Sequence, residues 1–282
     1  MNEDNPDSHG FELLMNAMYR QHPVRRPILG TRQTIAKINP ENLHLTHRAF
    51  YRPDNMLLCV VGDVDPEQVC DLASRVVPEA PKDTVQVHRH WQEEMTCPQA
   101  KVEDKTEVAM TSFQLGFKCE PADVGQEAIR QELMGDLAAE ALFGESSELY
   151  LRLYEQGLID NSFGGGYETV DGMAMLTVAG DSPDPDAVKA AIMEQAQKLC
   201  REGIAQEDFM RMKRSAMGRR VRDLDSMDAT CFRMCACSLI DFDYFKFPAI
   251  YRQLEAADVV AFLQRVVTEE RTALCVLHPN ET

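Results

Sequence analysis

The sequence has little positive charge, a single tryptophan and no long apolar run. Its 282 residues carry 29 Lys and Arg against 46 Asp and Glu, which gives a formal net charge of −17. Such an acidic protein is a poor non-specific ligand for nucleic acids and anionic lipids, because their phosphates repel it. The longest wholly apolar run, residues 56–61, is far too short to span a bilayer. We therefore expect no nucleic-acid partner and no membrane partner.

Signs of export are also missing. The first ten residues, MNEDNPDSHG, are polar and acidic, unlike a secretory signal or a transit peptide. The nine cysteines are odd in number and scattered through apolar segments, a pattern typical of reduced thiols rather than of a disulfide framework. These features predict a cytoplasmic protein.

The composition that remains is that of an ordinary globular chain, 44% hydrophobic and 27% charged. Apolar periodicity and capping residues predict helices over residues 11–20, 40–51, 65–77, 123–142, 147–156, 185–202, 206–239 and 257–266. Strands are predicted over 55–63, 113–117, 160–168, 173–179 and 272–277. Residues 78–106, rich in proline and charge, are predicted to form an exposed linker. Helices and strands do not alternate in strict βαβ order, so the sequence favours the α+β class.

No complete nucleotide-binding or metal-binding motif is present. The chain lacks a Walker loop and a G-x-G-x-x-G, and the run Gly164–Gly166 is typical of a strand or a bulge. The histidines nearest to a metal-binding pattern are His44 with His47, His88 with His90, and His9 with Glu12. Each set is short of the three or four ligands that zinc requires, and Leu13 stands where H-x-x-E-H needs its second histidine. We interpret these side chains as solvated or core-edge histidines.

Two further clusters allow a structural and a functional interpretation. On a helix Cys231 and Cys235 share a face while Cys237 points elsewhere; without a fourth ligand nearby we favour buried structural thiols, with zinc or cluster binding as the alternative. The basic run of residues 211–222 would spread around a helix axis. We therefore favour a solvated or domain-contact helix over a site for phosphate or an acidic substrate.

A longer pattern extends over nearly the whole chain. The segment from His22 to Val69 contains, in order, HP, PILGT, FY, P-x-NM and VVGDV. Residues 146–159 contain SS-x-LY and LYE-x-GLI, and residues 274–279 agree at the chain end. In their order and spacing these pieces resemble the insulinase/pitrilysin family of inverted-zincin metallopeptidases. Within it, the likeness is to bacterial members associated with elongation factor P modification.

This resemblance implies a metallopeptidase-half layout, in which an antiparallel or mixed sheet is packed by helices. Residues 1–100 would be the C-terminal remainder of the first, zinc-site domain, and residues 106–282 a complete second, non-metal domain. The parent would be a zinc endopeptidase that cleaves peptides with metal-activated water.

The chain departs from the family at the zinc site. The family uses H-x-x-E-H and a distal Glu; the motif does not occur here, and Met1 falls just after the position of the distal Glu. We therefore predict no catalytic residue, no metal ligand and no cofactor in this chain, with zinc only in the parent. The chain would be an inactive downstream fragment that forms part of a peptide-enclosing chamber. The alternative is a non-catalytic chamber-forming or scaffold subunit that pairs with an active partner, and a binding domain unrelated to peptidases is a third possibility.

Substrate-binding residues are predicted from the family's partner half, which holds the peptide main chain with an Arg and a Tyr. Aligned on Gly157, these positions carry Tyr154 and Asp160, while Arg152 and Tyr167 lie nearby. Arg152, Tyr154 and Tyr167 are therefore the predicted substrate-binding residues. The expected partners are a peptide or protein substrate and either a second copy of this chain or a second peptidase-like half, because missing strands would leave sheet edges and apolar faces uncovered.

Overall fold

The computed structural model describes residues 5–79, 92–121, 124–170 and 172–280, and the chain divides into two compact units. Unit 1 comprises residues 1–26, 91–218 and 246–282, and unit 2 comprises residues 27–90 and 219–245. These units are defined by contacts within the structure, whereas the predicted domains, 1–100 and 106–282, are defined by the family resemblance. The predicted domain limits therefore stay a prediction.

Unit 1 is built on a five-stranded sheet with the strand order β1-β5-β2-β4-β3. The strands are β1 (Lys101–Thr106), β2 (Ser112–Lys118), β3 (Gly164–Val170), β4 (Met173–Asp181) and β5 (Thr272–Pro279). β1 runs parallel to β5, whereas the other pairs are antiparallel. The predicted α+β class with a mixed sheet is confirmed. The predicted linker was wrong over β1, because an edge strand with mostly exposed, polar side chains gives no apolar alternation.

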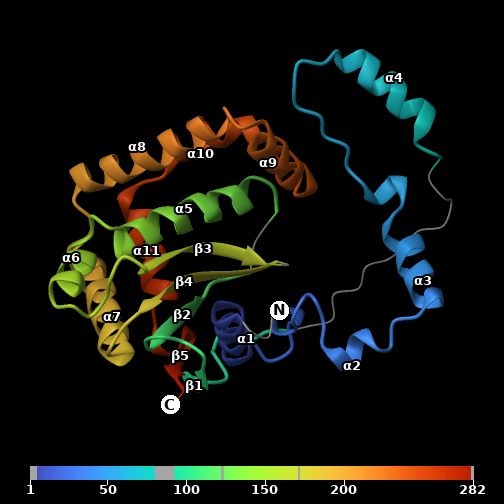
Figure 1. Ribbon diagram of the computed structural model, residues 1–282. Coiled ribbons are helices and arrows are strands. Elements are labelled where there is room, and N and C mark those ends of the chain that lie inside the picture. Colours follow the sequence, from blue (N-terminus) through green and yellow to red (C-terminus); the bar gives the residue numbers. More distant parts are fainter. Residues whose placement is uncertain (1–4, 80–91, 122–123, 171, 281–282) are drawn as a thin grey trace. The chain divides into compact units, whose positions relative to one another are not determined.

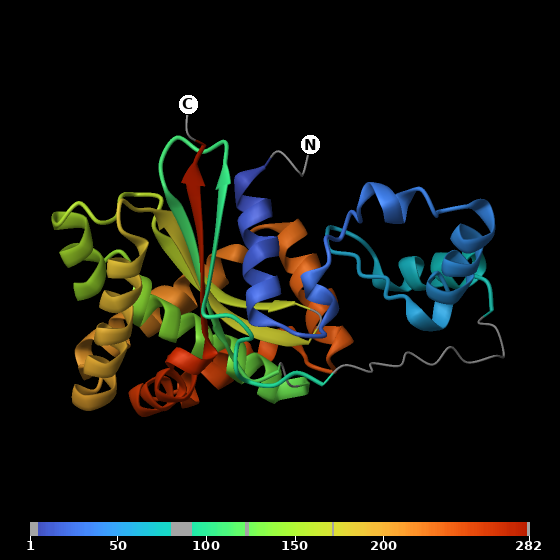
Figure 2. The same ribbon diagram turned by 90° about the horizontal axis from the view of Figure 1, so that it is seen from below.

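Helices cover both faces of this sheet (Figure 1). The helices of unit 1 are α1 (Pro6–Met18), α5 (Gly125–Phe143), α6 (Glu148–Glu155), α7 (Pro185–Glu202), the first part of α8 (Gln206–Asp223), α10 (Phe247–Gln253) and α11 (Ala256–Val266). On one face α1 packs Leu14 and Met18 against a core that includes Met175 and Cys275. On the other face α5 packs against β3 and α11, as the turned view in Figure 2 also shows. The apolar residues of alternate strand positions are therefore enclosed on both sides.

The predicted helices of unit 1 are confirmed, with shifts of a few residues at their ends. Local capping explains this accuracy: the Ser147 hydroxyl accepts the backbone N–H of Tyr150, and the Asp184 carboxylate accepts that of Ala187. The predicted helix over 206–239 is instead two helices, because Ser226 caps a new one. Helix α10 was not predicted.

Unit 2 contains α2 (Arg32–Ile35), α3 (Pro40–Phe50), α4 (Pro66–Val76) and α9 (Met227–Leu239). The side chains of Asn39 and Asp65 cap α3 and α4, with proline at the first helical position, as predicted. The predicted strand over 55–63 was wrong. Strands require a neighbouring backbone to pair with, and this run pairs with no strand in the described part of the chain.

The remaining regular segments are short 3₁₀ turns at Pro23–Arg25, Pro53–Asn55, Tyr244–Lys246 and Glu269–Arg271. None of the helices in the described ranges combines the length and the apolar character that a membrane crossing needs.

Candidate functional site

Two of the predicted substrate-binding residues lie on α6. Arg152 Nη1 lies 3.4 Å from a carboxylate oxygen of Glu194 on α7. Its Nη2 is buried and has no hydrogen-bond partner among the described residues. Tyr154 is exposed, and its ring stacks on that of Tyr150 with the centroids 5.9 Å apart. α6 thus presents one accessible aromatic ring and one guanidinium group that is paired at Nη1 but, within the described residues, has no partner at Nη2.

The third predicted residue, Tyr167, lies inside unit 1. Its ring packs edge-on against Phe262 of α11 at 6.1 Å and fills the space that the missing side chain of Gly135 leaves. Burial raises the pKa of its phenol. The hydroxyl has no hydrogen-bond partner in the described ranges. Tyr167 is therefore a neutral core residue, whereas Tyr154 is exposed; their roles in substrate binding stay predictions.

A buried ion pair that the sequence did not reveal joins Glu93 to Lys118 in unit 1. The Nζ of Lys118 lies 3.2 Å from a Glu93 oxygen, and the two side chains are 2% and 4% exposed, respectively. This ammonium also donates to the carbonyl oxygen of Met18 at 2.9 Å and lies 4.4 Å from the ring centroid of Tyr19. The prediction of an exposed linker is thus wrong at Glu93 as well.

The Glu93 carboxylate also joins two distant parts of the backbone. It accepts hydrogen bonds from the backbone N–H groups of Arg20, Gln21 and His22. Burial opposes its charge, yet these three donors, together with Lys118, hold the pKa of Glu93 below its ordinary value. Residues 20–22 shortly precede the point where the chain leaves unit 1, and Glu93 shortly follows its return. The ionised carboxylate of Glu93 therefore links the segment that leaves unit 1 to the segment that returns to it, and its role is structural.

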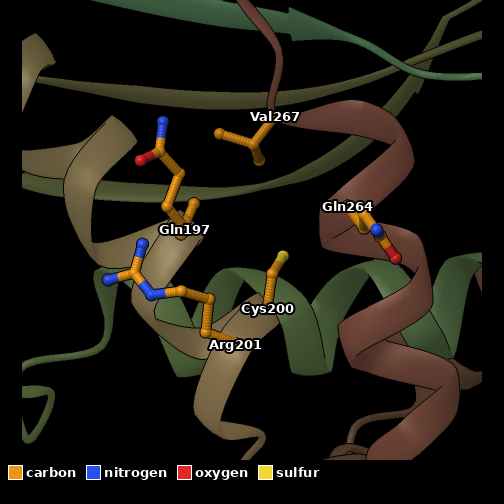
Figure 3. A pocket seen from close by; sticks show the side chains of 6 residues that line it. Gln197, Cys200, Arg201, Gln264 and Val267 are labelled. Atoms are coloured by element: carbon orange, nitrogen blue, oxygen red, sulfur yellow. The ribbon is translucent and has the colours of Figure 1, made fainter.

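A pocket of about 240 Å³ lies on unit 1. It is lined by Ala196, Gln197, Cys200, Arg201, Gln264 and Val267, from α7 and from α11 and the residue after it (Figure 3). Burial raises the pKa of the Cys200 thiol, which makes this thiol a poor nucleophile at neutral pH. The lining contains no carboxylate or histidine that could act as its base, so the pocket offers no acid–base pair for catalysis.

Two of the histidines named above, His9 and His47, and one residue of the basic run make local contacts. His9 Nε2 lies 2.8 Å from an Asp104 oxygen, and the ring of His47 stacks on Tyr51. His88 and His90 lie outside the described residues. Within the basic run, Lys213 donates to the carbonyl oxygen of Leu254 at 2.7 Å. This contact is in line with the favoured prediction of a solvated or domain-contact helix.

One group of potential metal ligands is present in the described part of the chain. The sulfur atoms of Cys59, Cys231 and Cys235 in unit 2 all lie within 4.8 Å of one another. As predicted, Cys231 and Cys235 share a helix face and Cys237 does not join them. Three thiols do not match the two histidines and one glutamate of a zinc peptidase centre. The described residues therefore do not fit a hydrolytic zinc ion.

Unit 2 also exposes many large apolar side chains. None of the residues of α2, α3 and α4 is buried, although α3 and α4 are amphipathic. The apolar surface, as we call it, consists of Ile28, Leu29, Ile35, Ile38, Leu43, Leu45, Phe50, Tyr51, Met56, Leu57, Leu58, Val60, Val64, Leu72, Val76 and Val77. Soluble proteins rarely expose so many apolar residues in one short segment unless they bind something there.

Comparison with known sequences identifies relatives of this arrangement. Residues 37–216 match a family profile described as the peptidase M16 inactive domain. The chain is 30% identical to the uncharacterized zinc protease YmfH of Bacillus subtilis (strain 168), over 99% of its own length and 66% of that of YmfH. The chain thus spans slightly less than two thirds of this relative.

Solved structures agree with the sequence comparison. An M16-like peptidase from Alicyclobacillus acidocaldarius superimposes with a TM-score of 0.90 at 25% identity, over 99% of this chain and 67% of that chain. A chain of complex III2 from Candida albicans, solved with Inz-5 bound, gives a TM-score of 0.79 at 12% identity, over 98% of this chain and 67% of that chain. The second likeness shows a shared fold.

Proposed function

Because the chain belongs to the M16 peptidase family and matches that family's inactive domain, we propose that it forms the non-catalytic part of a peptide-enclosing chamber. Hydrolysis would require a zinc-bearing region that the described residues do not provide, since their one ligand cluster consists of three thiols. The chain alone would then be inactive as a peptidase.

The apolar surface of unit 2 carries this proposal. α3 and α4 have the periodicity of helices that bury one face, yet side chains such as Leu45 and Leu72 are exposed. Burying one such side chain is worth about 1.5–3 kcal/mol, so covering even a few of them would stabilise a complex. YmfH is about half as long again as the matched region. We propose that the zinc-bearing region covers the apolar surface.

That region could be supplied in two ways. It could belong to the same parent chain, which makes the present sequence the downstream fragment of a zinc endopeptidase. Alternatively, it could belong to a partner, which makes this chain a chamber-forming or scaffold subunit. The fold is shared with a chain of complex III2, which is part of an assembly. This likeness supports the arrangement in which a partner supplies the zinc-bearing region. In either case a peptide or protein is the proposed substrate, and the net charge of −17 would attract basic peptides.

Genomic sequence and a peptidase assay distinguish these arrangements. An in-frame H-x-x-E-H encoded upstream of Met1 supports the longer parent, and its absence from the upstream sequence supports a partner. The purified chain with added zinc should not hydrolyse peptides in either case. Hydrolysis that depends on residues of this chain would contradict the proposal. We also propose a cytoplasmic location, which is supported by the lack of any disulfide among the nine cysteines, all of which are described.

Association tests the apolar surface directly. We expect the chain to self-associate or to bind a peptidase-like half, and Leu72→Asp to weaken this association about tenfold or more by placing a charge in an apolar contact. Leu151→Asp is the matched control, because Leu151 is similarly exposed but lies on α6 of unit 1. Sedimentation velocity measures both variants. A wild-type chain that stays monomeric at high concentration and binds no half would refute the proposed role of this surface.

A further inference from the structure

Three cysteines converge in unit 2 from positions far apart in the sequence. Cys231 and Cys235 lie one turn apart on α9, and Cys59 lies in the irregular run between α3 and α4. All three sulfur atoms are within 4.8 Å of one another, and the Cys231 thiol donates to the backbone oxygen of Cys59 at 3.6 Å. The three residues are partly buried. The i, i+4 spacing places both thiols on one face of α9, where they face the third thiol.

We propose that Cys59, Cys231 and Cys235 form a tris-thiolate site for a thiophilic d¹⁰ cation, and that the bound ion is Zn²⁺. Zn–S bonds are about 2.3 Å long, so sulfur atoms around one tetrahedral zinc ion lie about 3.8 Å apart. The observed spread of at most 4.8 Å therefore needs only a small contraction. A single disulfide, by contrast, would bring two sulfur atoms to about 2 Å and leave the third thiol without a partner.

Metal binding would displace the protons of the thiols. Burial, and then the neighbouring thiols Cys231 and Cys235, raise the pKa of Cys59 to about 11, so protons compete with the metal for this thiol and binding should tighten as the pH rises. Binding of Zn²⁺ would replace three S–H protons by three Zn–S bonds, releasing three protons to solvent and leaving a site of net charge −1. No oxidation state changes. The fourth position would be held by water, since no further His, Cys, Asp or Glu of the described residues joins the group.

Such a site would cross-link two distant segments of the chain. It would link the run that contains Cys59 to α9, since Cys59 and Cys231 are 172 residues apart in the sequence. The two segments of unit 2 would thereby be held together. The inference does not depend on the proposed chamber function. It amends the expectation that this chain contains no metal ligand, while leaving the expectation of no hydrolytic zinc in place.

Metal titration of the full chain tests the site. Reduced, chelator-treated protein should bind one Zn²⁺ with release of about three protons, and Cd²⁺ should produce the ultraviolet charge-transfer absorption of a thiolate complex. Mg²⁺ should not compete, because it prefers oxygen ligands. Bound zinc should protect three cysteines from alkylation, as counted by mass spectrometry. Absence of stoichiometric binding, or protection of a different set of cysteines, would overturn the proposal.

Variants assign the ligands. Cys235→Ser should weaken Zn²⁺ binding by more than about 100-fold, since loss of even an outer-shell partner costs about 10–100-fold. Cys59→Ser should do the same from the other segment. Cys70→Ser, an exposed thiol on α4 of the same unit, is the control and should bind like the wild type. Circular dichroism confirms that each variant is folded. Equal loss of binding in Cys70→Ser, or wild-type binding in Cys235→Ser, would contradict the assignment. Peptide hydrolysis and association are measured separately, so failure of the metal site leaves the chamber proposal standing.

Discussion

Truncation of Glu93 to Ala should strongly destabilise unit 1. Lys118 is only 2% exposed, and the change removes the Glu93 carboxylate that pairs with its ammonium group. It also removes the acceptor of three backbone N–H groups at residues 20–22. Breaking a buried ion pair by removing one partner costs about 3–5 kcal/mol, most of it from the charge left unpaired. This is a large part of the about 5–15 kcal/mol by which most domains are stable.

A charge-neutral double variant separates the pair from its surroundings. Glu93→Gln keeps one acceptor oxygen and should cost about 1–3 kcal/mol, because the buried ammonium loses a charged partner. Adding Lys118→Met removes that ammonium, so the double variant should recover part of the loss. The interaction energy of the cycle should be about 1–3 kcal/mol.

Urea unfolding followed by circular dichroism measures these differences from the transition midpoint at a constant slope. Glu148→Ala is the matched control for Glu93→Ala. Glu148 pairs with Lys198 at 2.7 Å, but these side chains are 61% and 36% exposed, respectively, and such solvent-accessible pairs contribute little. The reasoning would be refuted if Glu93→Ala destabilised the protein no more than this control does.

Three further changes have defined outcomes. The pKa of Glu93 is lower in the folded state than in the unfolded state, so its ionisation stabilises the fold above the unfolded-state pKa of about 4.3, and this stabilisation is lost as the pH falls through the folded-state pKa. Between about pH 6 and pH 3, the urea midpoint should therefore fall less steeply in Glu93→Gln than in the wild type. Leu115→Ala, at a fully buried position of β2, should cost about 2–5 kcal/mol in the same unfolding assay. Gly135→Ala should destabilise by about 1–3 kcal/mol despite alanine's better helix propensity, because its methyl group would collide with the ring of Tyr167; a melting temperature equal to or above that of the wild type would contradict this.

Local chemistry explains which elements the sequence predicts well. The ends of α3 and α4 follow from Asn39 with Pro40 and from Asp65 with Pro66, because a cap is a contact within three residues. The amphipathic helix α5 and its end at Gly144 likewise follow from short-range periodicity. These features depend on neighbours that the sequence places side by side.

The errors involve partners that are distant in the sequence. The run at 55–63 has strand composition but pairs with no strand of the described chain, whereas the polar β1 is a strand because β5 supplies its partner. Glu93 lies in the charged segment that was predicted to be a linker, and only the fold shows that it faces Lys118. Similarly, the CFRMCAC sequence indicated two thiols on one face but could not reveal the third, Cys59, on another segment.

The strand order constrains when the sheet can form during synthesis. β5 lies between β1 and β2, and β1 pairs with β5 alone in the described part of the chain. On the ribosome, strands β1 to β4 therefore emerge before β5, which joins β1 to the β2-β4-β3 part of the sheet. The edge of β2 that pairs with β5 stays unpaired until residues 272–279 are made. Such delayed long-range closure slows folding and exposes nascent chains to aggregation. A chaperone that shields the growing edge would be most useful to this protein during that interval.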